Sequence, residues 1–378
     1  MKIEQRQWIS KKWEPALSSA SLSAAQLVLA FGSTSLLKEK KWLEEAAKTY
    51  PKAVFFGCST AGEICGTRVF DETVVLTAIH FEHTTVEVVN TKIQNADQSI
   101  EAGSDLGKKL KKENLAHVFV LSDGLSINGS DLVKGLTREL PKNIAITGGL
   151  SGDGSRFKET LVLSGDVAEK GMVAALGFYG KRLKISYASV GGWDSFGPER
   201  LITKSTGNIL YELDGKSALE LYKKYLGEHA KGLPATGFLF PLSLRTKEGE
   251  AGVVRTILSV NEKEQSLTFA GNMPEGAMAR LMKANFDRLI DGATAAAKSS
   301  HTGGDSSSPE LAILISCVGR KLILKQRVEE EVEGVRNILG DKTILTGFYS
   351  YGEISPFTPG AKCELHNQTM TITNFSEI

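Results

Sequence analysis

One pattern of hydrophobic and polar positions recurs three times along the chain. Each copy has a short apolar run, a longer amphipathic stretch, a second apolar run and then a turn rich in glycine and serine. Short runs rich in Val and Ile between such turns predict buried strands, and a helix between two of them predicts a parallel crossover. The first strands are expected at 26–31, 117–122 and 311–316, and the second strands at 53–57, 144–148 and 343–347.

The turns that follow the second strands share a spacing of residue types. Counting starts at the glycine that ends each strand: Gly57, Gly148 and Gly347. A hydroxyl residue stands three positions later in every copy: Thr60, Ser151 and Ser350. An acidic residue follows five or six positions after the glycine: Glu63, Asp153 and Glu353. A further alternating apolar stretch comes after each turn, at 73–81, 160–165 and 366–375. The repeat predicts a mixed α/β fold of two lobes, built from recurring β-α-β-turn-β units with mixed sheets.

The segments between the copies supply the remaining elements. Strands are expected at 83–91, in a meander from 171 to 190, and in a hairpin around 261–265. Helices are expected at 98–112, at 217–227, and at 275–298 with an interruption at Gly292. A polar loop is expected at 299–309, and Gly191–Pro198 is the best candidate for the crossing between the lobes.

Composition narrows the class of protein. With 378 residues, 41% of them hydrophobic and 24% charged, the chain fits a soluble globular protein. A formal net charge of +1 argues against a nucleic-acid binder. No apolar run approaches the roughly 20 residues of a membrane span, and the first residues lack the apolar core of a signal peptide. Four cysteines in so long a chain make no disulfide framework, so we expect a cytoplasmic protein.

Function is expected at the glycine- and serine-rich turns. In open α/β sheets ligands bind beyond the carboxyl ends of parallel strands, where such turns lie. Backbone N–H groups and hydroxyls suit a carboxylate, and the adjoining acidic side chains suit an amine, so an amino acid or similar small carboxylate is the expected ligand. The alternative is that the turns only bend the chain. The predicted ligand-binding residues are Ser59, Thr60, Gly62, Glu63, Asp123, Ser151, Gly152, Asp153, Arg320, Tyr349, Ser350, Tyr351 and Glu353.

Several of these candidates have a plainer interpretation. Asp123 ends a predicted strand but begins an Asp-Gly turn. Arg320 offers a guanidinium for a carboxylate, or is an exposed arginine that starts a helix. Tyr349 and Tyr351 flank Ser350 and either wall a pocket or simply pack.

Two other classes of function stay open. An enzyme would use Cys58, Cys317 or a turn serine as nucleophile, although no histidine base is identifiable near any of them. A haem-binding gas sensor would use one of six scattered histidines as axial ligand. No HExxH or CxxC spacing completes a metal site, so no metal and no other cofactor is expected.

Several longer motifs resemble the FIST family (F-box and intracellular signal transduction proteins). They are GCSTAGEI, VLSDGLSINGSDLVKGL, TGGLSGDG, YELDGKSALELYKKYLG, ISCVGRKLIL, TGFYSYGEISP and LHNQTMTI. They occur in the order of the family and run from about Leu22 to the C-terminus. The resemblance implies an extension at 1–21, a FIST N-terminal domain at 22–214 and a FIST C-terminal domain at 215–378, in which the family's C-terminal lobe itself ends near Pro356.

The resemblance implies a sensory module for a small ligand, an amino acid included, and in some relatives for haem and nitric oxide. Relatives join this module to kinase, chemoreceptor, cyclase or F-box segments, and we expect none of these segments in this chain. We therefore expect a stand-alone, non-enzymatic sensor that signals to a separate protein such as a kinase or chemoreceptor. Replacing Ser151 and Arg320 with alanine is expected to abolish binding and to leave thermal stability nearly intact.

Overall fold

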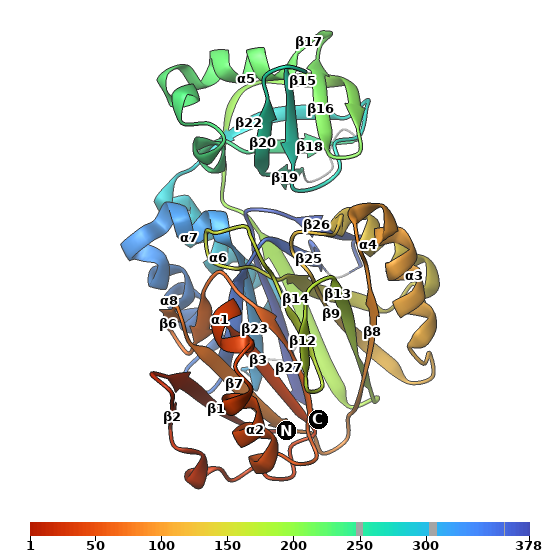
Figure 1. The fold of residues 1–378 in the computed structure, drawn as a ribbon, viewed down its shortest axis with the longest axis vertical. Coiled ribbons are helices and arrows are strands. Elements are labelled where there is room, and N and C mark those ends of the chain that lie inside the picture. The colour runs from red at the N-terminus through yellow and green to blue at the C-terminus, as the bar shows by residue number, and fades with distance from the viewer. Residues whose placement is uncertain (247–251, 302–307, 359) are drawn as a thin grey trace.

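A large body made of three sheets carries a smaller, strand-rich domain at one end (Figure 1). The computed structural model describes residues 1–246, 252–301, 308–358 and 360–378. Helices and mixed sheets alternate as the sequence predicts, and the mixed α/β class with recurring units is confirmed. The two chain ends lie together at the end of the large body that is remote from the small domain (Figure 1).

The first unit of the large body occupies the N-terminal segment. Strand β3 runs parallel to β4, and β7 returns antiparallel to β3. Strand β1, in the segment expected as an extension, pairs with β7 from Lys2 opposite His80 to Trp8 opposite Val74. In chain order the elements are β1 (Lys2–Ile9), β2 (Lys12–Glu14), β3 (Leu27–Gly32), α1 (Thr34–Leu37), α2 (Lys40–Thr49), β4 (Val54–Ser59), β5 (Glu63–Cys65), β6 (Arg68–Phe70) and β7 (Val74–His80).

The second unit repeats this order. Strand β9 runs parallel to β10, β13 returns antiparallel to β9, and β8 takes the place that β1 has in the first unit. Its elements are β8 (Thr85–Lys92), α3 (Ser99–Lys109), β9 (Leu115–Ser122), α4 (Gly129–Glu139), β10 (Ala145–Leu150), β11 (Val162–Ser164), β12 (Val167–Glu169) and β13 (Met172–Tyr179).

The third unit is divided by the small domain. Strand β14 precedes that domain, and the other elements follow it: β23 parallel to β24, with β27 antiparallel to β23 and paired with β14. Its elements are β14 (Leu183–Val190), α6 (Phe286–His301), β23 (Leu311–Cys317), α7 (Val318–Leu324), α8 (Val328–Leu339), β24 (Ile344–Ser350), β25 (Gly352–Pro356), β26 (Cys363–His366) and β27 (Met370–Glu377).

The three units exchange hairpins in a ring. The hairpin β5–β6 of the first unit extends the sheet of the third unit through β24, and β25–β26 of the third extends the sheet of the second through β10. The hairpin β11–β12 of the second unit closes the ring by pairing with β4 of the first. Each glycine- and serine-rich turn is therefore the point at which the chain leaves its own sheet for a neighbouring one.

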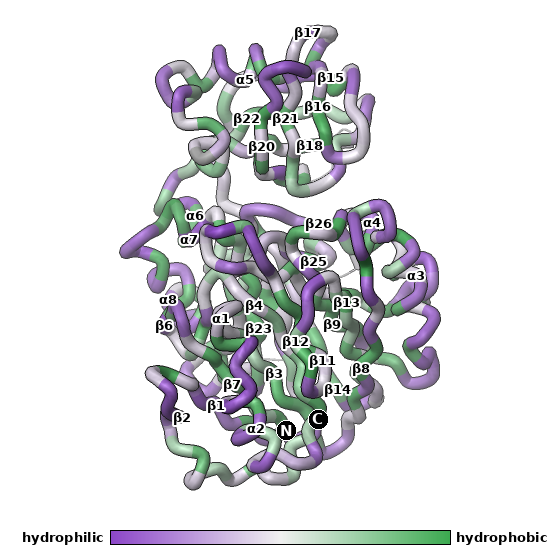
Figure 2. Tube along the Cα trace, in the orientation of Figure 1, coloured by the Kyte–Doolittle hydropathy of each residue, from purple (hydrophilic) through white to green (hydrophobic). Residues whose placement is uncertain are grey.

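The inner faces of the three sheets share one apolar core. Aromatic contacts join every pair of units: Phe31 to Phe348 at 4.8 Å, Phe56 to Phe119 at 6.2 Å, and Phe178 to Phe375 at 5.1 Å between ring centroids. The hydropathy of the chain agrees with this arrangement: the strands of the large body are mostly apolar, and the outer helices carry many of the polar residues (Figure 2). The turns between the units are consequently anchored to sheets that pack on a common core.

The small domain has its own sheet and core between the two parts of the third unit. Its sheet has the order β19-β18-β22-β15-β16-β21-β20, and its core includes Leu210, Leu219, Tyr222 and Phe269. Its elements are β15 (Asp194–Thr206), β16 (Ile209–Leu213), β17 (Lys216–Ser217), α5 (Ala218–Leu226), β18 (Leu242–Arg245), β19 (Val253–Arg255), β20 (Ile257–Asn261), β21 (Ser266–Phe269) and β22 (Met278–Lys283).

Two element predictions are wrong. The helix expected at 275–298 is strand β22 followed by helix α6, and Gly292 lies inside α6 against the Gly191 carbonyl. The meander expected through 190 does not form, because β13 and β14 belong to different sheets. The stretch 160–165 forms a strand as expected, β11, which pairs with β4 of the first unit, and the returning strand of the second unit is β13. Of the polar loop expected at 299–309, residues 299–301 end α6 and 302–307 lie outside the described residues.

Candidate functional site

The three turns meet where the three units join and bind one another through the backbone. The Ala61 N–H donates to the Tyr349 carbonyl, and the Tyr349 N–H donates back to Gly62, both at 2.8 Å. The Gly152 N–H donates to Ser59 at 2.9 Å, which joins the second turn to the first. The turns converge, and their side chains are buried among one another and form no open cleft by themselves.

The carboxylates Glu63 and Glu353 make matching hydrogen bonds. Glu63 accepts from the Thr60 hydroxyl at 2.5 Å and from the Thr73 hydroxyl at 2.8 Å. Glu353 accepts from the Ser350 hydroxyl at 2.6 Å, and from the hydroxyl and the N–H of Thr369 at 3.0 and 3.1 Å. Burial raises the pKa of Glu63 to about 7 and that of Glu353 to about 8. In both units the acidic residue fastens the turn to the start of the returning strand.

Two aspartates from the predicted site hold loops in place. Asp153 accepts from the N–H groups of Phe157 and Lys158 at 2.8 Å and of Glu159 at 2.9 Å, and the Tyr351 hydroxyl also donates to it. Asp123 accepts from the N–H groups of Leu125 at 2.9 Å and Ser126 at 2.7 Å. Each aspartate thus fixes a loop that carries an exposed hydrophobic side chain, Phe157 in one case and Leu125 in the other.

Those two side chains face a cleft of about 200 Å³ between the large body and the small domain, called here the interdomain cleft. On the large body it is bordered by the carboxyl ends of β10 and β23 and by the residues that follow β9 and β24. From the small domain, Leu258, Phe238, Asn208 and Thr256 line the opposite side. Leu125, Phe157 and Leu258 are 41%, 36% and 44% exposed, although apolar side chains of this size are mostly buried elsewhere in the chain.

Stacked aromatic rings form one wall of the interdomain cleft. Phe157 lies 4.4 Å from Tyr351 with an interplanar angle of 15°, so the two rings stack. Across the domain boundary, Phe157 lies 6.1 Å from Phe238 at 27°. The two bodies therefore touch through ring contacts beside the cleft, and hydrogen bonds also join them, such as that from Asn128 to Asn272 at 2.7 Å.

The polar groups of the interdomain cleft are uncharged. No Asp, Glu, Lys, Arg or His is among the described residues that line it. Thr256 is 3% exposed, and its Oγ1 has no hydrogen-bond partner within the described chain. Asn208 donates through Nδ2 to the Phe269 carbonyl at 2.7 Å. The cleft is an apolar site with a few hydroxyl and amide groups, as small-molecule sites commonly are.

A second, more open cleft of about 520 Å³ lies beside the first turn. Thr60 and Glu63 line it together with three cationic side chains and two further carboxylates: Arg156, Lys321, Lys325, Asp71 and Glu72. Lys321 donates to the Ala61 carbonyl at 2.9 Å and pairs with Asp71, and Arg156 lies 3.5 Å from Glu72. Most of the charges in this cleft are therefore already paired with one another.

Arg320 is not the exposed arginine or free anion ligand that the sequence suggests. Its side chain is fully buried, and it donates to Glu331 and to the carbonyls of Leu289 and Gly191. Ser151 is also buried and donates to the Ser122 carbonyl at 2.9 Å. The buried pair argues against the expectation that alanine at Arg320 leaves stability nearly intact, because the Glu331 carboxylate would stay buried without its cation.

The predicted site residues are distributed unevenly. Tyr351 lines the interdomain cleft, and Thr60 and Glu63 line the second cleft. The others line neither: Ser59, Gly62, Asp123, Ser151, Gly152, Asp153, Arg320, Tyr349, Ser350 and Glu353. Sequence reasoning missed Leu125, Phe157, Phe238, Thr256 and Leu258. The only available signal was that Leu125 and Phe157 follow the predicted residues Asp123 and Asp153 closely.

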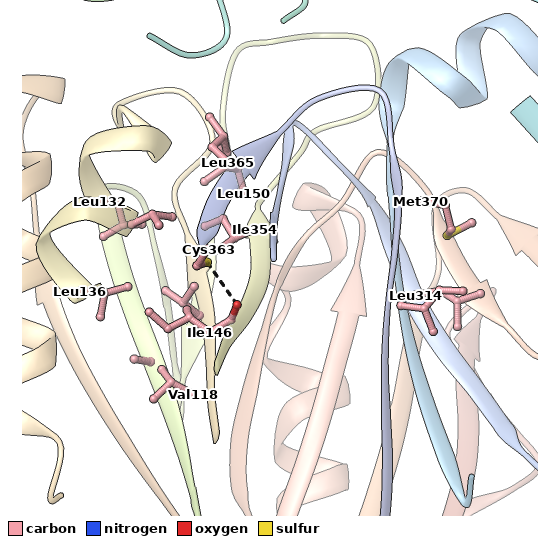
Figure 3. Close-up of a cluster of buried hydrophobic side chains, with 14 of the residues drawn as sticks. Val118, Leu132, Leu136, Ile146, Leu150, Leu314, Ile354, Cys363, Leu365 and Met370 are labelled. Atoms are coloured by element: carbon pink, nitrogen blue, oxygen red, sulfur yellow. Dashed lines mark hydrogen bonds between the residues drawn. The ribbon is translucent and has the colours of Figure 1, made fainter. Parts of the chain in front are cut away.

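The cysteines and buried histidines behave as packed side chains. Burial raises the pKa of the Cys58 and Cys317 thiols well above the usual range. Cys363 donates to the Ile146 carbonyl at 3.3 Å within an apolar cluster (Figure 3). Burial lowers the pKa of His117 to about 3 and of His366 to about 4. Within the described ranges no cluster of metal-ligating side chains occurs, and no helix there has the length and apolarity to cross a bilayer.

Comparison with known proteins identifies the family. Residues 26–216 match the FIST N domain, and residues 218–356 match the FIST C domain. The chain belongs to the FIST family. FIST domains are sensory domains of signal transduction. The two matches of this FIST chain meet between β16 and α5, so both sequence domains contribute strands to the small domain.

Relatives add little on function. An uncharacterized protein of Methanocaldococcus jannaschii is 26% identical over 325 residues, and the match covers 79% of this FIST chain and 62% of that protein. Among solved structures, a cyanuric acid hydrolase from A. caulinodans is 7% identical, with a TM-score of 0.35 and coverage of 99% of this chain and 98% of that one. A TM-score of this size carries no inference about activity.

Proposed function

We propose that this FIST protein is a sensor that binds a small molecule in the interdomain cleft. The observation that carries the proposal is the cleft itself, where Leu125, Phe157 and Leu258 are exposed to the same space. It lies at the carboxyl ends of parallel strands, which is where ligands bind in α/β sheets. Single apolar side chains are often exposed by chance, but several that gather in one concave site indicate a binding function.

Signalling would follow from the position of the site between two bodies. A ligand that contacts both bodies favours the arrangement in which both sets of contacts are made, and shifts the population toward it. The chain enters the small domain through Gly192, whose φ of +90° places it in the left-handed region. A change in the arrangement would be recognised by a separate signalling protein, such as a kinase or chemoreceptor.

The environment of the cysteine in the interdomain cleft argues against catalysis by a thiol nucleophile. Cys317 lines the interdomain cleft, but its thiol is 3% exposed and its pKa is raised by burial. A thiol nucleophile reacts as the thiolate, which this environment disfavours. A haem iron would need an axial ligand, and no histidine is among the described residues that line either cleft.

The second cleft is the candidate site for an amino acid or small carboxylate. Lys321 and Arg156 lie there with Glu63, so both poles of a zwitterion would find an opposite charge. A ligand would first have to displace the ion pairs that Lys321 and Arg156 already make. For this reason we assign the sensory ligand to the interdomain cleft.

A thermal-shift screen tests the assignment with two matched variants. A ligand that binds only the folded state stabilises it by about 2.7 kcal/mol at a hundredfold excess over Kd. Leu258→Glu places a charge in the interdomain cleft, whereas Leu201→Glu changes a leucine of similar exposure (40%) on β15 that does not line the cleft. We expect Leu258→Glu alone to abolish the shift. A shift that survives Leu258→Glu, or a library without any shift, contradicts the proposal.

A further inference from the structure

The lining of the interdomain cleft restricts the chemistry of its ligand. All polar side chains that line it are amides, hydroxyls or a thiol, among them Asn128, Asn208, Thr256 and Cys317. A charged ligand would lose its hydration there without gaining an opposite charge, which is costly in an apolar environment. A buried cation, Arg255, lies close behind Gly271, but it donates to the carbonyls of Leu365 and Asn272 and borders a different groove.

The shape of the cleft favours a flat ligand. Phe157 and Tyr351 present stacked rings from the large body, and Phe238 and Phe269 stand on the side of the small domain. A planar molecule contacts such walls over its whole face and gains stacking beyond the apolar area that it buries. The volume sets the size: cavities of roughly 150 Å³ hold benzene, so about 200 Å³ suits one ring with a small substituent.

Two polar side chains, Thr256 and Asn208, line the small-domain side of the cleft. The Thr256 hydroxyl makes no hydrogen bond although it is buried. Buried polar groups normally have a hydrogen-bond partner, so this hydroxyl is available to a ligand. Asn208 uses Nδ2 for the Phe269 carbonyl, and as a lining residue of the cleft it also carries an amide oxygen that can accept a hydrogen bond. A ring that carries an amide, with both a donor and an acceptor, would satisfy the pair.

We infer that the interdomain cleft binds a small, uncharged ring compound that carries an amide-like group. The inference rests on the proposed function and narrows it, because it excludes amino acids and small carboxylates from this site. It assigns Thr256 as a residue that determines ligand specificity, and Phe157, Tyr351 and Phe238 as the stacking surface.

Matched pairs of probes test the charge requirement. Benzamide and benzoate differ in charge and little in shape, and so do nicotinamide and nicotinate. By calorimetry with the full chain, we expect each amide to bind at least about tenfold more tightly than its acid, the ratio that corresponds to one net hydrogen bond or more. Leu258→Glu is expected to remove the binding of the amides, and Leu201→Glu to retain it.

Thr256→Val tests the hydroxyl, with Thr373→Val as the matched control. Both threonines are buried with an unpartnered Oγ1, but Thr373 lies on β27 and does not line the cleft. Both variants should melt at or above the temperature of the wild type, because each loses an unsatisfied hydroxyl. Thr256→Val alone should weaken amide binding, by about tenfold.

The outcomes separate this inference from the proposed function. If benzoate, nicotinate or an amino acid binds as tightly as the amides and Leu258→Glu removes that binding, the charge inference is wrong and the proposed function stands. If neither member of either pair binds, the inference is overturned and the proposed function is decided by the wider screen. Unchanged amide binding in Thr256→Val overturns the role of the hydroxyl.

Discussion

Arg320 and Glu331 form an ion pair in which both side chains are fully buried. Two guanidinium nitrogens donate to Glu331 Oε2, at 3.0 and 2.7 Å, while Oε1 accepts from Ser316 at 3.0 Å and from Tyr349 at 2.6 Å. Arg320 also donates to Leu289 at 2.6 Å and to Gly191, which are residues of α6 and of the segment that enters the small domain. The pair therefore ties the third unit to the base of the small domain.

Replacing Arg320 with alanine should destabilise the protein strongly. The Glu331 carboxylate would stay buried without its cation, and breaking one side of a buried pair costs about 3–5 kcal/mol. Urea unfolding measures the loss. Arg200→Ala is the control, because its pair with Asp214 is partly exposed at 25% and 39% and should be worth at most about 1 kcal/mol. An equally small loss in Arg320→Ala would contradict the importance of the buried pair.

Stability should fall between neutral and alkaline pH. Burial raises the pKa of Glu353 to about 8 and of Glu63 to about 7, against an ordinary value of 4.5. The folded state then binds more protons than the unfolded state, so the stabilisation is complete below about pH 4.5 and is lost as the pH rises through 7 and 8. Melting temperature measured from about pH 6 to 9 should therefore decline.

Glutamine at position 353 should flatten this decline, because an amide resembles the protonated carboxyl and cannot ionise. Glu159→Gln is the control: Lys170 and Lys38 lower the pKa of the Glu159 carboxyl, so it stays ionised throughout this pH range. A Glu353→Gln variant with the pH dependence of the wild type would show that this carboxyl is already ionised at neutral pH.

The strands of the three units could be predicted from the sequence because each is a local apolar run bounded by turn residues. The partner of each hairpin could not: β5 pairs with β24, which is far away in the sequence, and only tertiary packing selects that partner. The error at 275–298 has the same origin. Residues 278–283 favour a helix intrinsically, but β15 and β18 flank them on both sides and make them a strand.

The candidate site was predictable only in part. The sequence located the strand ends correctly. The polar side chains there, however, bind backbone groups of the neighbouring loops, as Asp153 binds the N–H of Phe157, because those groups have no partner in a sheet. The residues that line the interdomain cleft are apolar, and an apolar residue in a sequence is expected to be inside. That Leu125 and Leu258 face each other follows from the placement of the small domain, which no local pattern contains.

The glycine before each turn should tolerate no side chain. A Cβ at Gly57, Gly148 or Gly347 would lie 1.8 to 1.9 Å from the carbonyl oxygen of the neighbouring parallel strand. Alanine at any of the three should therefore separate the strands and cost about 1–3 kcal/mol or more. Gly207→Ala is the control for the clash, since nothing lies within 4 Å of its Cβ position and alanine there meets only the backbone strain of a φ of +56°. Loss of stability in only one of the three variants would contradict the equivalence of the units.

Asp153 should act on ligand binding through the loop that presents Phe157. Asparagine has one acceptor oxygen where the carboxylate has two, so Asp153→Asn should free one or more of the amides of Phe157, Lys158 and Glu159. Hydrogen exchange at these amides should accelerate by about tenfold or more, and the ligand-induced thermal shift should shrink.

Asn261 provides the control, because it accepts from Lys263 and Glu264 in a hairpin of the small domain that does not line the interdomain cleft. Asn261→Ala should accelerate exchange at Lys263 and Glu264 and leave the thermal shift unchanged. If Asp153→Asn loosens its loop and the shift persists in full, Phe157 does not contact the ligand. If the shift disappears while exchange at 157–159 is unaltered, Asp153 touches the ligand itself, as the sequence first suggested.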